Sequence, residues 1–277
     1  EADRMESPLL TPESLKSEMS VVRNEYERGE NSAFQLAHKR LFATAYLAHP
    51  YHHSTIGWKS DIENVTAESL KAFHDKYYTP SNATYTFVGN FDPELIKTQV
   101  AKYFGHIKPG DDIDKMYTVE PEQSGIRRVS VKRQSRSSIL GLGFKGPHGL
   151  HKDSIVLSVL AHILTSGPDA SVAPLKQKGI VHDVIASWER VKDPFLFVLW
   201  CTTNYPTQDA IDNAEKNMLR TLANFKKPTE ESVKIAIKAL DFQWKGSMEG
   251  TKNLAMAINE AISRGDAYDV WNRFSVL

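Results

Sequence analysis

The 277-residue sequence has little cysteine, no excess charge of either sign and no long hydrophobic run. Its single cysteine, Cys201, can form neither a disulfide within the chain nor a cysteine-based zinc site. The 34 Lys and Arg residues balance the 34 Asp and Glu residues, so nucleic-acid binding driven by overall charge is not expected. No apolar run approaches the ~18 residues that a membrane-spanning helix needs, and no signal peptide is visible. The composition, with 41% hydrophobic and 25% charged residues, is typical of a globular protein.

Common catalytic and nucleotide-binding motifs are also absent. The sequence has no Gly-x-x-x-x-Gly-Lys phosphate loop and no Gly-x-Ser-x-Gly nucleophile elbow. Neither His-Glu-x-x-His nor the inverted His-x-x-Glu-His occurs, so the sequence contains no complete zinc-peptidase helix. Histidines are densest at His49, His52 and His53, where we predict a turn with partly exposed imidazoles rather than a metal site.

Hydrophobic spacing and turn residues predict two α+β units. In the first half the expected helices cover about 12–29, 34–46, 66–77 and 92–104, with one strand at 83–88. In the second half the expected strands cover 127–133, 138–144, 180–191 and 195–203, and the expected helices cover 152–165, 173–178, 208–225, 230–245 and 251–264. Strands joined by short turns should pair antiparallel, so we expect antiparallel sheets covered by helices on one face.

A linker is predicted between the two units. Residues 109–125 contain two prolines, two glycines and an acidic cluster, which favours an irregular segment between units 1–108 and 126–277. One strand cannot bury its own face, and the first residue is Glu1 rather than Met. We therefore expect the chain to be a piece of a longer protein.

Two glutamates on the first long helix are candidate metal ligands. Glu18 and Glu25 are seven residues apart, so both carboxylates face the same side of the helix, about 10 Å apart along its axis. One of them could bind a metal ion while the other takes an outer role. Surface helices are rich in glutamate, however, and the spacing alone favours a solvated helix face.

Seven segments together resemble the M16 zinc metallopeptidases, the family of insulin-degrading enzyme, pitrilysin and mitochondrial processing peptidase. These segments are 1–5, 18–25, 49–57, 61–64, 70–78, 80–83 and 88–93. Their order and spacing are similar to the second half of the family's catalytic domain. The resemblance implies that residues 1–108 belong to that domain, and that 126–277 form the following non-catalytic domain, cut short at its end.

The resemblance also implies roles for individual residues. In this family a His-x-x-Glu-His helix supplies two zinc ligands and a glutamate base, and a glutamate on a later helix completes the zinc site. Glu25 matches that last ligand, and Glu18 matches an acidic residue two turns earlier. Many active members offer an Arg and a Tyr from the later domain to the substrate, and this sequence has Lys176 and His182 there. Without the His-x-x-Glu-His segment, we expect that this chain alone neither binds zinc tightly nor cleaves peptides.

Three hypotheses about function follow. The first is a part of a bacterial zinc metalloendopeptidase, periplasmic or cytoplasmic, that cuts peptides or unfolded polypeptides held as an extra strand. The second is a non-catalytic M16 homologue acting as a partner or structural subunit, in a homodimer or with another M16 subunit. Lys176 and His182 favour this alternative, whereas Glu18 and Glu25 oppose it. The third is a self-contained binding module, which the missing strands make the weakest.

Overall fold

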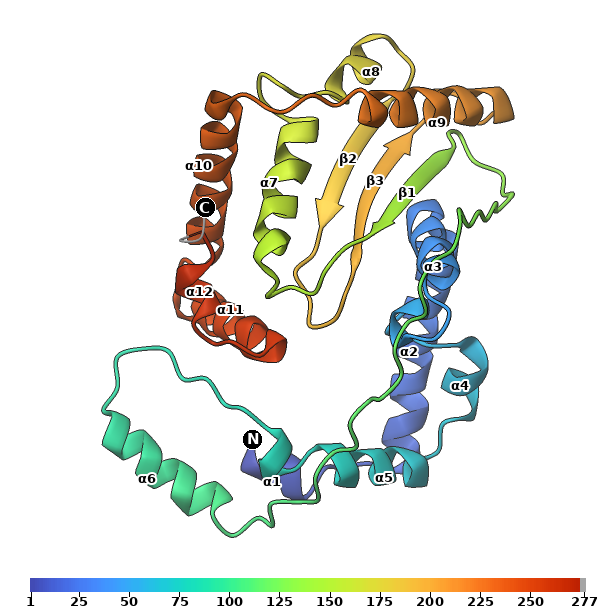
Figure 1. Cartoon of the computed structure of the whole chain (residues 1–277). Helices are drawn as coiled ribbons and strands as arrows, with labels where there is room; N and C mark the ends of the chain where they lie inside the picture. The colour runs from blue at the N-terminus through green and yellow to red at the C-terminus, as the bar shows by residue number, and fades with distance from the viewer. Residues whose placement is uncertain (275–277) are drawn as a thin grey trace. The chain divides into compact units, whose positions relative to one another are not determined.

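The computed structural model describes residues 1–274. The chain divides into two compact units, a first unit of Glu1–Arg127 and a second unit that begins at Arg128 (Figure 1). Between Phe104 and Ile139 the chain forms neither helix nor strand. Each unit is described by itself below. The assignment of the units to particular domains of a family stays a prediction.

The first unit is entirely helical in its regular structure. Its elements are α1 (Ala2–Glu6), α2 (Pro12–Asn31), α3 (Ala33–Ala45), α4 (Lys59–Asn64), α5 (Ala67–Tyr77), α6 (Pro93–Phe104) and the 3₁₀ turns η1 (Pro50–His52) and η2 (Pro80–Asn82). Helix α2 starts where the sequence predicts, because the Thr11 side chain accepts from the Ser14 backbone N–H and Pro12 fits the first turn. Helix α2 packs against α3 and α4.

The largely buried Lys39 contacts residues from the neighbourhood of all three helices, and we call it the caged Lys39. The Nζ of Lys39 donates to Glu30 Oε1 at 2.9 Å and lies 4.9 Å and 5.0 Å from the ring centroids of Tyr26 and Trp58. Only 13% of the Lys39 side chain is exposed. The ion pair and the two cation–π contacts therefore connect residues of α2 and α3 with the residue that precedes α4.

Two strand predictions are wrong. Residues 83–88 and 127–133 are irregular, and no strand in the described part of the chain pairs with either segment. Tyr85 and Phe87 are 41% and 47% exposed, and Val129 and Val131 are exposed to a similar extent. Their alternating pattern is typical of a strand, but a strand forms only where a neighbour accepts its backbone hydrogen bonds.

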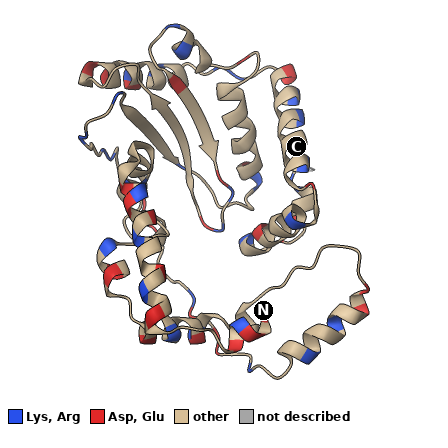
Figure 2. Ribbon diagram, turned by 180° about the vertical axis from the view of Figure 1, so that it is seen from behind, with Lys and Arg blue, Asp and Glu red and all other residues tan. Residues whose placement is uncertain are grey.

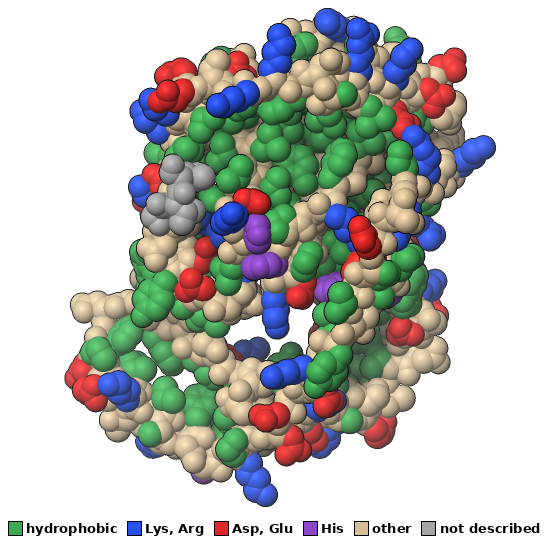
Figure 3. Space-filling model, viewed as in Figure 1, with side chains coloured by type: hydrophobic (Ala, Val, Ile, Leu, Met, Phe, Trp, Pro, Cys, Tyr) green, Lys and Arg blue, Asp and Glu red, His purple; other side chains and the backbone are tan. Residues whose placement is uncertain are grey.

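The second unit contains a three-stranded antiparallel sheet in the order β1-β3-β2. The strands are β1 (Ile139–Lys145), β2 (Asp183–Trp188) and β3 (Leu196–Thr202). Trp200 in the central strand pairs with Gly141 on one side and with Ile185 on the other. The central strand is buried over nearly its whole length, and Figure 3 shows hydrophobic side chains gathered over the region of the sheet and α7.

A layer of helices packs against this sheet. The helices of the second unit are α7 (Lys152–Thr165), α8 (Ala173–Gln177), α9 (Gln208–Ala223), α10 (Glu230–Ser247), α11 (Thr251–Arg264) and α12 (Asp269–Asn272). Of these, α7, α8 and α9 contact the sheet, whereas α10 packs against α7. The main core joins Leu164 of α7 and Met218 of α9 to alternate residues of β3, among them Leu199. This arrangement confirms the predicted α+β class with antiparallel strands under a helical layer.

Charged side chains of both signs are interspersed along the helices, whereas the strands carry few (Figure 2). Helix α10 packs against α7 through Ala236, Val159 and Ile163.

Among residues 1–274, no helix combines the length and hydropathy needed to cross a membrane.

Candidate functional site

The two candidate glutamates lie on α2, as the sequence predicts. Glu18 and Glu25 are both exposed, and neither forms a hydrogen bond or ion pair with any residue in 1–274. The cap at Thr11 and the packing against α3 and α4 fix the helix that carries them. The two carboxylates are thus available to an external partner, with no internal cation competing for them.

Glu18 and Glu25 do not form a zinc site by themselves. A zinc site in a protein uses three or four protein ligands. Within residues 1–274, no group of three or more His, Cys, Asp or Glu side chains is placed to hold a metal ion. Glu25 could therefore serve only as one member of a larger ligand set.

The histidine-rich segment forms a turn, as predicted, but its first imidazole is buried. His49 is 6% exposed, and its Nδ1 accepts from the Tyr51 backbone N–H at 3.2 Å. His52 Nδ1 lies 2.9 Å from the His49 carbonyl oxygen, and His53 Nδ1 lies 3.2 Å from that of Ser54. Each imidazole thus makes a local backbone contact that shapes the turn.

A carboxylate from the irregular segment anchors this turn, which the sequence did not indicate. The backbone N–H groups of Leu47, Ala48 and His49 donate to the Glu120 carboxylate at 2.9–3.1 Å. Arg127 Nη1 donates to the Ala45 carbonyl at the end of α3, at 2.8 Å. A cation at the carbonyl end of a helix and an anion at free N–H groups are both favourable. We call these contacts the Glu120–Arg127 strap.

The second pair of candidate residues flanks the turn between α8 and β2. Lys176 Nζ donates to Asp183 Oδ1 at 3.1 Å, and this hydrogen bond lowers the pKa of the Asp183 carboxyl below its ordinary value. The His182 side chain is exposed, while its backbone N–H donates to the Thr202 carbonyl at 2.7 Å. The turn passes through Gly179 at φ +66°, a conformation that favours glycine.

The structure therefore pairs Lys176 with Asp183, the residue that follows His182 in the chain and a partner that the sequence did not indicate. In the sequence, only the position of Asp183 next to the candidate residue His182 pointed to Asp183 as part of this site. Glu18 and Glu25 form another group, which belongs to the first unit, whereas Lys176 and His182 belong to the second.

Comparisons with known proteins identify relatives. The zinc protease PqqE of Helicobacter pylori is 35% identical over 170 residues, which cover 60% of this chain and 38% of that protein. A probable mitochondrial-processing peptidase subunit beta of Schizosaccharomyces pombe is 28% identical over 108 residues, 39% of this chain and 24% of that protein. The chain thus matches well under half the length of these curated relatives.

A solved structure and a family model also match this chain. The crystal structure of a protease from Helicobacter pylori superposes with a TM-score of 0.88 at 25% identity, covering 99% of this chain and 68% of that one. The family model described as the peptidase M16 inactive domain matches residues 64–240. Since that match covers more than half of the sequence, the chain belongs to the M16 peptidase family.

Proposed function

We propose that the chain is part of a zinc-dependent metalloendopeptidase that hydrolyses peptides or unfolded polypeptides. The observation that carries this proposal is Glu25, an exposed carboxylate without a partner in residues 1–274, on a capped and packed helix. Relatives named as zinc proteases support the reaction class. In this proposal Glu25 is one zinc ligand of the whole protein, and Glu18 is an acidic residue beside the metal.

The 277-residue chain by itself is proposed to be inactive. One glutamate does not supply the three protein ligands of a catalytic zinc site, and residues 1–274 offer no further group that does. A zinc titration of this chain, followed by calorimetry, should show no site tighter than that of an exposed carboxylate. Submicromolar zinc binding would contradict this part of the proposal.

Lys176 and His182 are proposed to contact the substrate. Lys176 is 60% exposed, and its ammonium group binds Asp183 at the surface; His182, the residue before Asp183, is also exposed. Both side chains can donate to the carbonyl oxygens of an extended peptide. Lys176→Met should therefore raise KM for a peptide in the whole protein, while zinc content stays unchanged.

The decisive experiment is Glu25→Gln in the whole protein, with zinc content and peptide cleavage measured together. Glutamine keeps the side-chain volume but removes the charge that a zinc ligand needs, so we expect loss of bound zinc and of cleavage. Glu27→Gln is the matched control, because Glu27 lies on the same helix and makes only a 3.8 Å exposed ion pair with Lys59. Full zinc content and activity in Glu25→Gln would overturn the ligand assignment.

A second candidate is a non-catalytic subunit that pairs with another M16 chain or with a second copy. The observation that favours it is the match to the family's inactive domain, together with a relative named as a subunit of a peptidase. This alternative expects a whole protein without bound zinc that elutes as an oligomer. Finding stoichiometric zinc in the whole protein would decide for the peptidase. A bacterial periplasmic or cytoplasmic location is proposed in both cases.

A further inference from the structure

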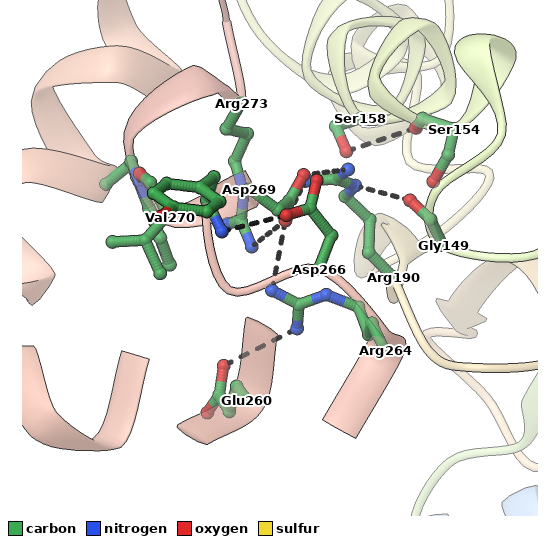
Figure 4. A network of polar contacts seen from close by, with 12 residues as sticks. Gly149, Ser154, Ser158, Arg190, Glu260, Arg264, Asp266, Asp269, Val270 and Arg273 are labelled. Atoms are coloured by element: carbon green, nitrogen blue, oxygen red, sulfur yellow. Dashed lines mark hydrogen bonds and ion pairs between the residues drawn. The ribbon is translucent and has the colours of Figure 1, made fainter. Parts of the chain in front are cut away.

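The second unit contains a buried arginine cluster around one carboxylate (Figure 4). Arg190, in the connection between β2 and β3, binds Asp269 of α12 through two hydrogen bonds of 3.0 Å and 2.7 Å. Its Nε also donates to the Gly149 carbonyl at 2.9 Å. The side chains of Arg190 and Asp269 are 10% and 8% exposed. This bidentate pair already neutralises the Asp269 charge.

Two more guanidinium groups approach the same carboxylate oxygen. Arg264 Nη2 donates to Asp269 Oδ2 at 3.1 Å, and Arg273 Nη2 lies 3.8 Å from that oxygen. Arg273 is stacked over the Trp244 ring at 3.5 Å, and the Trp244 N–H donates to the Val270 carbonyl. The stacking fixes the plane of the Arg273 guanidinium while leaving its N–H edge unused.

The guanidinium groups of Arg264 and Arg273 have more N–H donors than the surrounding residues have acceptors. Among residues 1–274, Arg264 makes one hydrogen bond and Arg273 makes none, and the Nε atoms of both are buried without a partner. The remaining acid nearby is Glu260, whose carboxylate is 3.9 Å from Arg264 Nη1 and whose side chain is 62% exposed. Asp266 instead accepts from the Tyr268 backbone N–H. Positive charge in the cluster is therefore left uncompensated.

The energetic consequence is visible in Arg273. Burial, together with the charges of Arg190 and Arg264, lowers the pKa of Arg273 to about 10, while the charges of Asp269 and Glu260 oppose the shift. A buried guanidinium whose N–H groups lack acceptors is destabilising, and it favours a planar or tetrahedral oxyanion that accepts two N–H groups at once. Arg273 keeps 15% of its side-chain surface exposed, which leaves a route for a small ion.

We infer that Arg264 and Arg273 together bind an oxyanion, the carboxylate or phosphate group of a small ligand, between α11 and α12. The bound anion balances the charge left by the Arg190–Asp269 pair. It also connects the end of α11 to the segment after α12, on the unit that holds Lys176 and His182. This site does not depend on zinc or on the proposed peptidase reaction.

The test measures thermal unfolding of the 277-residue chain against inorganic phosphate and, in a second arm, against acetate, with chloride at matched ionic strength as the reference. A ligand that binds only the folded state raises the midpoint with a saturable dependence on its concentration. We expect saturation with at least one oxyanion, and the arm with the lower half-saturation identifies phosphate or carboxylate. No saturable rise above chloride in either arm would overturn the inference.

Variants locate the site. Arg273→Met keeps an apolar side chain over Trp244 but removes the donors, so half-saturation should rise about tenfold, the loss of one charged hydrogen-bonded contact. Arg220→Met, an exposed arginine of α9, should bind as the wild type does. If Arg273→Met does not fold, Arg273→Lys and calorimetric titration of the wild type replace it, and lysine should again weaken binding. Equal binding in the wild type and in either Arg273 variant would show an adventitious ion only and overturn the inference.

Discussion

The two units bury their hydrophobic residues to very different degrees. Among residues 1–274, four hydrophobic residues are buried in the first unit and twenty are buried in the second. The four are Leu36, Phe42, Tyr46 and Ile62. In the same first unit Phe73, Phe87 and Leu95 are 47–55% exposed. Burial of apolar area is the main favourable term in folding, so the second unit has the stronger basis for independent stability.

What holds the first unit together is mostly polar. The Glu120–Arg127 strap, the caged Lys39 and the caps at Thr11 and Thr66 each satisfy groups at helix ends or pair charges. Such contacts contribute about 1 kcal/mol each, less than a well-packed core side chain. The starts of α2 and α5 are thus encoded locally by their caps, although the Glu120–Arg127 strap joins residues more than seventy positions apart. The sheet of the second unit is stabilised by long-range packing of apolar side chains.

The largest expected effect is Leu199→Ala, at the centre of the second unit. Leu199 has no exposed surface and lies in the core that joins β3 to α7 and α9. We expect a loss of about 2–5 kcal/mol in the free energy of unfolding, measured by urea denaturation. Leu95→Ala in α6 is the control, because Leu95 is 55% exposed and should cost no more than about 0.5 kcal/mol. Similar costs for the two variants would remove the contrast between the units.

Local patterns in the sequence explain why many helices were predicted well. The Thr-Pro cap at Thr11, the cap at Thr66 and the Thr229 cap of α10 mark helix starts that the structure confirms. The strands β1, β2 and β3 were also anticipated, since short turns and apolar runs bound them. The segments 83–88 and 127–133 have similar strand-like composition and stay irregular, because strand formation depends on a partner and not on composition alone.

The contacts that the sequence could not reveal join residues far apart in the chain. Glu120 reaches the amides at 47–49 across more than seventy residues, and Arg190 reaches Asp269 across 79. No periodicity or spacing encodes such a pair. Glu25 and Lys176, by contrast, were selected by resemblance to a family, and the structure adds their exposure and the Asp183 partner of Lys176.

A second prediction tests the polar anchoring of the first unit. Glu120→Ala removes the acceptor of three backbone N–H groups, and the half-buried Ala48 and His49 amides lose their partner. We expect a loss of about 1–3 kcal/mol in local stability, seen as faster hydrogen exchange at residues 47–49 and at the end of α3. Exchange in β3 should not change. Unchanged exchange at 47–49 would show that the strap is not stabilising.

A third prediction concerns the start of α2. Thr11→Ala removes the side chain that accepts from the Ser14 N–H, which should cost about 1 kcal/mol of helix stability. Hydrogen exchange should rise in the first turn of α2 and much less near Glu25, which lies nearly four turns after Thr11 at about 3.6 residues per turn. Ser20→Ala is the control, because Ser20 lies on the exposed surface of the same helix and donates only to the Ser17 carbonyl. Equal exchange in both variants would argue against a role for the cap.

The smallest effect is expected from Lys176→Met in the second unit. Lys176 lowers the pKa of Asp183, so the ionised carboxyl stabilises the folded chain above its unfolded pKa of about 3.9, and this contribution is lost as pH falls through the lowered folded value. The variant should raise the Asp183 pKa in an NMR titration, with little change in unfolding at pH 7, because both side chains are about half exposed. Lys178→Met, which lacks this contact, should leave the titration unchanged. A large loss of stability at pH 7 would mean that a surface ion pair, rather than the apolar core, holds the second unit, and the contrast between the two units would then fail.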